Sequence, residues 1–226
     1  MNEIMKSVTL RNSVLLACLD DWKNYVLSNK EKIAQEIKLI DADYNADDYL
    51  SDEYRNKIMN MGSAHGGYPE RNKGYQLKLD QLKWVGEDQA FRLKHIANYR
   101  TLNETMGFNL GIKHNALCIA YPEQGFIGWH NNANASSYNI IFTYSETGDG
   151  YWEHFNPYTE QVERINDVPG WQVKASYLGA YSENNKNSLV YHSAKTNDCW
   201  RMTVSYIFGR ENKEWWEQAI EEVEND

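Results

Sequence analysis

The residues best suited to chemistry are His130 and Asn132, which lie two positions apart at the end of a predicted strand, 125–130. Strand side chains alternate between the two faces of a sheet, so these two side chains project from the same face. An imidazole nitrogen and an amide oxygen can both bind a metal ion. A second histidine, His192, follows the apolar run 189–191 far downstream. These residues together predict a metal site.

An arginine, Arg201, begins the last strongly apolar strand, 202–208, between Trp200 and Met202. These flanking residues indicate that the guanidinium is buried. An unpaired buried charge is costly, and a bound carboxylate would explain its presence. We therefore interpret Arg201 as a carboxylate-binding residue.

The elements that precede this region are predicted to be mainly helical, because apolar residues recur there at helical spacing. The irregular loop that follows the second helix contains His65, which we interpret as a surface histidine. The predicted elements are helices at 13–39, 52–61 with Ser51 as its N-cap, and 87–105, an acidic connector at 41–48, a loop at 62–74 and an edge strand at 76–85.

After Gly107 the pattern changes to short runs of β-forming residues separated by turns rich in Gly, Asn and Pro. This spacing is typical of a double-sheet jelly roll. The predicted strands are 117–121, 125–130, 138–144, 151–155, 170–177, 188–191 and 202–208. We predict a single α+β domain over 1–226: a helical layer at 1–107 packed on one sheet, a jelly-roll core (double-stranded β-helix) at 108–210, and a C-terminal helix at 211–226 with Trp215 or Trp216 inward.

The composition of the chain narrows the classes of function that we expect. The chain of 226 residues has 23 Lys and Arg against 32 Asp and Glu, a formal charge of -9. This charge and the lack of a basic cluster disfavour nucleic-acid binding, and favour a small-molecule or protein or peptide substrate. The three cysteines form no CxxC pair, which favours a reducing compartment and argues against a cysteine-bound zinc ion. With no signal peptide and no apolar run long enough to span a bilayer, we expect a soluble, cytoplasmic protein.

The order of these motifs resembles the iron(II)- and 2-oxoglutarate-dependent oxygenases, in particular their prolyl-hydroxylase-like and alkyl-demethylase-like branches. The resemblance covers roughly 115–208: a strand with His-x-Asn, a turn followed by Tyr-Trp-Glu, a second strand with His, and Arg-x-Thr on the last core strand. It implies hydroxylation of a C–H bond, with Fe(II) as cofactor and 2-oxoglutarate as co-substrate.

The resemblance also implies a role for individual residues. His130 and His192 would bind iron, Arg201 would bind the far carboxylate of 2-oxoglutarate in a bidentate fork, and Thr203 would add a hydroxyl group. The residues that would line the cofactor and substrate space are Trp129, Tyr138, Ile140 and Tyr144.

The sequence departs from the family pattern at Asn132, where the family has Asp or Glu. Four interpretations follow: Asn132 ligates iron weakly, Glu153 supplies the carboxylate, the position is vacated as in related halogenases, or the fold has lost iron chemistry and serves in binding or assembly. Beside Glu153, His154 is predicted to face the other way, at the surface or behind the ligands. We interpret His95 and His114 as structural.

Overall fold

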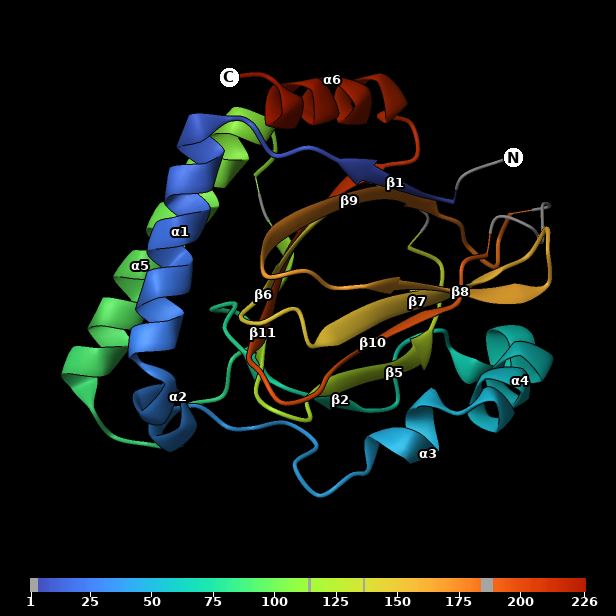
Figure 1. The fold of residues 1–226 in the computed structure, drawn as a ribbon, viewed down its shortest axis with the longest axis horizontal. Helices are drawn as coiled ribbons and strands as arrows, with labels where there is room; N and C mark the ends of the chain where they lie inside the picture. Colours follow the sequence, from blue (N-terminus) through green and yellow to red (C-terminus); the bar gives the residue numbers. More distant parts are fainter. Residues whose placement is uncertain (1–3, 114, 136, 184–188) are drawn as a thin grey trace.

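The computed structural model describes residues 4–113, 115–135, 137–183 and 189–226, and its core is a pair of antiparallel sheets that face each other (Figure 1). The larger sheet has the order β1 (Met5–Val8), β9 (Gly170–Leu178), β6 (Ser137–Ser145), β11 (Arg201–Gly209), β4 (Asn115–Tyr121) and β3 (Tyr75–Gln76). The smaller sheet has the order β2 (Asn72–Lys73), β5 (Phe126–His130), β10 (His192–Thr196), β7 (Gly150–Asn156) and β8 (Gln161–Asn166). The predicted α+β jelly roll is confirmed.

Long helices cover the outer face of the larger sheet. Figure 1 shows α1 (Ser13–Ser28) and α5 (Gln89–Leu110) side by side along it, with α6 (Lys213–Glu224) across one end. The main apolar core lies between these helices and the sheet, and it includes Trp22 of α1, Leu102 of α5 and Phe142 of β6. Burial of this apolar surface holds the helices and the sheet together.

Shorter helices cover the smaller sheet, where α3 (Ala46–Leu50) and α4 (Asp52–Met61) pack against β5. The Ser51 side chain accepts a hydrogen bond from the Tyr54 amide, as expected of an N-cap, and the helix ends at Gly62, whose φ of 55° favours glycine. A 3-10 turn, η1 (Gly62–His65), then begins the predicted loop.

Several predicted boundaries were wrong. The helix predicted at 13–39 is divided at Asn29, whose side-chain amide donates to the Tyr25 carbonyl (2.6 Å), and α2 (Lys30–Glu36) follows. The strand predicted at 76–85 is only the two-residue β3, because Gln81 turns back to the Lys78 carbonyl. Of the strand predicted at 188–191, residue 188 lies outside the described residues, and 189–191 precede the strand, which begins at His192.

The β2–β3 segment connects the two sheets at one edge. Asn72 pairs with Ile127 in the smaller sheet, and Gln76 pairs with Ile119 in the larger one. Both sheets are therefore held together there by backbone pairing. In the described part of the chain, no helix has the length and hydropathy that crossing a membrane requires.

Candidate metal centre

His130 and His192 lie side by side on the inner face of the smaller sheet. His192 pairs directly with His130 across β10 and β5, and the two ring centroids are 4.2 Å apart. Both side chains are buried. Residues directly opposite each other in an antiparallel pair point to the same face, so the register brings together two imidazoles that are 62 positions apart in the sequence.

Hydrogen bonds to the backbone determine the tautomer of both rings. His130 Nδ1 lies 2.8 Å from the Gly128 carbonyl oxygen, and His192 Nδ1 lies 3.0 Å from that of Val190. A carbonyl oxygen only accepts, so each Nδ1 carries the proton and each Nε2 keeps a lone pair. A histidine that donates Nδ1–H to a carbonyl while Nε2 faces a cavity has the usual arrangement of a metal ligand.

Burial keeps both imidazoles neutral. It lowers the pKa of His130 well below its usual value, and the neighbouring His192 lowers that pKa further. Burial likewise lowers the pKa of His192 to about 4. Because a metal binds the unprotonated imidazole, both residues are in the ligating form at neutral pH.

Asn132 follows β5 and lines the same cavity as the two histidines. Its φ of 64° is left-handed, a region in which asparagine is among the better tolerated residues. The preceding Asn131 supports the turn. Its backbone N–H donates to the Gly67 carbonyl (3.1 Å), and its side-chain oxygen accepts from the backbone N–H of Ala133 (3.0 Å). The described residues contain no group of three or more His, Cys, Asp or Glu side chains placed to hold a metal ion.

The interpretation in which Glu153 supplies the missing carboxylate was wrong. Glu153 points to the outer face of the smaller sheet, where it accepts hydrogen bonds from Arg164 (2.8 and 3.0 Å) and from the Ser193 hydroxyl (3.1 Å). Strand alternation puts its neighbour His154 on the inner face, opposite His192 in the register. His154 is buried, not at the surface, and its Nε2 lies 3.3 Å from a Glu163 carboxylate oxygen.

For the remaining histidines, the structure agrees with the prediction for His95 and differs from it for His65. His95 is buried, with Nδ1 3.1 Å from the Tyr25 hydroxyl and Nε2 2.9 Å from the Leu77 carbonyl oxygen, which is a structural role. The prediction that His65 is a surface residue was wrong, because its side chain is only 1% exposed. The local sequence gave no sign of this burial, which results from packing of the 62–70 loop. His114 lies outside the described residues.

Arg201 is buried between the sheets but is already paired. Its Nε donates to Asp167 Oδ2 (2.7 Å), and its Nη1 donates to the Thr203 hydroxyl (3.0 Å). Lys174 Nζ lies 3.9 Å from the other oxygen of Asp167, and all three charged side chains are at least 96% buried. Sequence reasoning missed Asp167 and Lys174, because neither is near Arg201 in the chain.

A cavity of about 400 Å³ between the sheets joins the two histidines to Arg201 and Thr203. Its wall is mainly apolar, with polar side chains at a few points. The residues of the larger sheet that line it include Ser137, Asn139, Ile141, Thr143, Arg201, Thr203, Ser205 and Ile207. A mainly apolar cavity with two neutral imidazoles and a buried cation placed in its wall suits a small organic anion.

Four residues expected to line this cavity do not. On β6 the alternation is opposite to the prediction: Asn139, Ile141 and Thr143 face the cavity, while Tyr138, Ile140 and Tyr144 pack on the helical side. The apolar side chains of β6 face the helices because the larger apolar core lies on that side of the sheet. Trp129 points away as well, packing on Tyr54 and Ile58 and donating from Nε1 to the Leu50 carbonyl (3.0 Å).

Comparisons with known proteins give structural neighbours only. No family model and no curated protein matches the sequence. A Pseudomonas putida prolyl-4-hydroxylase is similar at 13% identity over 91% of each chain, with a TM-score of 0.42. A 2OG-Fe(II) oxygenase-family oxidoreductase from Burkholderia pseudomallei is similar at 12% identity over 84% of this chain and 91% of its own, with a TM-score of 0.34. Drosophila melanogaster CENP-C, in a structure bound to CAL1, is similar at 9% identity over 69% of this chain and 97% of its own, with a TM-score of 0.30. These structural neighbours therefore include both oxygenases and CENP-C, whose structure is described by its partner CAL1. At such low similarity they give no argument about the activity of this protein.

Proposed function

We propose that this protein is an iron(II)- and 2-oxoglutarate-dependent oxygenase that hydroxylates a C–H bond of a peptide or small-molecule substrate. The observation that carries the proposal is the histidine pair. His130 and His192 are buried, neutral and adjacent, and the Nδ1 of each lies within hydrogen-bond distance of a backbone carbonyl, so the lone pair of each ring is on Nε2. Buried polar nitrogens arranged in this way are typical of a metal centre.

Residues that line the cavity would bind the iron and the co-substrate. His130 and His192 would hold the ferrous ion, with the Asn132 amide oxygen as a neutral third ligand, and Arg201 would lie at the carboxylate end of the cavity. With iron and 2-oxoglutarate bound, the site would use dioxygen as the oxidant, one oxygen atom entering the substrate C–H bond and the other the succinate that remains when the keto acid loses CO₂. The surrounding sheet walls would exclude bulk water from the reacting groups.

A second function, in a non-catalytic binding or assembly protein, is favoured by two observations. The third ligand position holds a neutral amide, which lowers the affinity of the site for a divalent cation. Arg201 also already has a carboxylate partner in Asp167, 2.7 Å away. This alternative predicts a folded cavity that binds neither iron nor 2-oxoglutarate.

Anaerobic addition of iron(II) and 2-oxoglutarate separates the two functions. An oxygenase should give the weak visible charge-transfer band of the chelate, and absence of the band would support the binding protein. His192→Ala should abolish the band. The matched control is His154→Gln, which changes a buried histidine on the same sheet face and should leave the band in place. A band that survives His192→Ala would exclude this residue as a ligand.

A further inference from the structure

Two side-chain amides from the β2–β3 segment, which connects the two sheets, line the cavity. Asn72 lies in β2 at the edge of the smaller sheet, and Gln76 lies in β3 at the edge of the larger sheet. Hydrogen bonds hold the backbone at both positions. The Asn72 N–H donates to a carboxylate oxygen of Asp41 (2.8 Å), and the N–H of Leu77 donates to the Cys118 carbonyl (2.8 Å). The two amides are therefore fixed parts of the cavity wall.

Each of these amides has a buried oxygen that accepts no hydrogen bond from the described residues. The two atoms are Asn72 Oδ1 and Gln76 Oε1. Nearly all buried polar groups in proteins are hydrogen-bonded, because an acceptor that is buried without a donor costs stability. Since both side chains line the cavity, their donors have to come from a molecule that occupies it.

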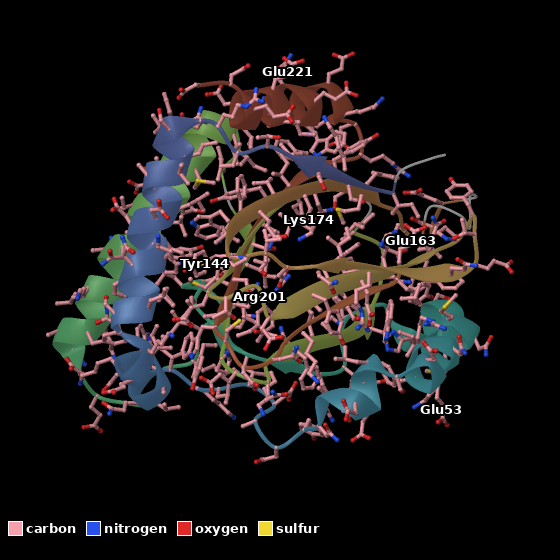
Figure 2. The ribbon with its side chains drawn as sticks, viewed as in Figure 1. Glu53, Tyr144, Glu163, Lys174, Arg201 and Glu221 are labelled. Atoms are coloured by element: carbon pink, nitrogen blue, oxygen red, sulfur yellow. The ribbon has the colours of Figure 1, made fainter. Side chains whose placement is uncertain are left out.

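The charge of the cavity wall restricts the kind of donor. Among the described residues that line the cavity there is no Asp or Glu, whereas Arg201 contributes a buried positive charge. Figure 2 shows Arg201 and a second cation, Lys174, in the interior between the sheets. These charges would repel a ligand ammonium group. The N–H of an amide carries no net charge, so it reaches the two oxygens without this repulsion.

We propose that Asn72 and Gln76 recognise amide groups, so that the ligand of this cavity is a peptide or another carboxamide and not an amine. A side-chain amide offers both a donor and an acceptor, and so does the amide group of a peptide. Apolar residues of the wall, such as Leu117 and Ile127, would contact the carbon atoms of the ligand. This inference deepens the proposed function and rests on it for the reaction, but recognition of the amide requires no metal ion.

Two uncharged probes that differ in one group test the proposal. N-acetylalanine N-methylamide has two N–H groups, and in N-acetylalanine methyl ester an oxygen replaces one of them. Binding of each probe to the full, metal-free chain at pH 7 is measured by heteronuclear NMR, in which the side-chain NH₂ signals of Asn and Gln are visible. The amide should bind about fivefold more tightly than the ester, because the ester leaves one buried oxygen without a donor. It should also shift the NH₂ signals of Asn72 and Gln76.

Two variants remove the oxygens one at a time. Gln76→Met and Asn72→Leu each leave a single acceptor, which either probe can satisfy, so the preference for the amide should disappear. Each variant should also raise the melting temperature by about 2 °C, because it removes an unpaired buried acceptor. The matched control is Gln124→Met. The Gln124 amide lies at the exposed surface and donates to Asp198 (3.0 Å), so its loss should leave the preference unchanged and should not raise the melting temperature.

Three results would overturn the proposal: no binding of the amide probe to wild type, equal affinity for amide and ester, or a preference for the amide that survives both variants. The melting temperature shows whether each variant is folded. Recognition of the amide without the iron(II) charge-transfer band would support this subsite and exclude the oxygenase. The band without a preference for the amide would support the oxygenase and overturn the subsite.

Discussion

Replacing Lys174 by methionine should stabilise the protein by an amount that depends on pH. In the unfolded chain the amine has its usual pKa of 10.5, and in the folded protein burial lowers it to about 8. Between these values the unfolded chain holds a proton that the folded protein has released, so wild-type stability rises with pH there and is lowest below pH 8. Because each pH unit is worth about 1.4 kcal/mol, the charged lysine costs the fold about 3 kcal/mol at pH 7 and about 1 kcal/mol at pH 10.

Methionine carries no proton, so the variant should recover that cost. The free energy of unfolding is measured by urea titration of wild type and variant at pH 7 and pH 10. The gain should be about 2 kcal/mol larger at pH 7, and any contribution from methionine packing cancels in this difference. An equal gain at both pH values, or a loss of stability at pH 7, would refute the reasoning by showing that Lys174 has a compensating partner.

Three further variants test the metal centre and its support. Asn132→Asp adds a negative charge at the third ligand position and should tighten iron(II) binding about tenfold in an anaerobic titration; unchanged affinity would mean that position 132 does not face the metal. Glu153→Gln weakens the outer-face contact with Arg164 and should lower the free energy of unfolding by about 1–2 kcal/mol, while a change in iron affinity would contradict its assignment to that face. Gly67→Ala should cost about 2 kcal/mol or more, because φ is +75° and the added Cβ would meet the Asn131 side-chain oxygen at 2.3 Å; a melting temperature equal to wild type would show that the loop moves freely.

The jelly roll could be predicted because most of its strands carry strong local signals. The runs 138–144 and 202–208 are rich in β-branched and aromatic residues, and turns rich in Gly and Pro separate the strands. Three strands were missed, including the two-residue β2, which lies within the predicted loop 62–74. The short β1 has only four residues, and β8 is exposed along nearly all of its length. Strands of this kind form because a neighbouring edge pairs with them.

The candidate site was predictable only in part. His130 and His192 could be found because each follows an apolar strand signal in the sequence. The face to which each side chain of a strand points was harder to predict. On β6 apolar or aromatic residues occur at both odd and even positions, so only the position of the helices determines which set faces the core. The pairing of Asp167 with Arg201 joins residues 34 positions apart, and no local pattern indicates it.

The left-handed backbone at Asn132 restricts which residues suit this position. Glycine, asparagine and aspartate best tolerate such a φ, and of these only asparagine and aspartate offer an oxygen to the cavity. The two side chains have nearly the same shape and differ in one terminal group, NH₂ or oxygen. The backbone therefore allows the proposed metal centre either a neutral or an anionic third ligand at position 132, and exchanging one for the other requires no rearrangement of the fold.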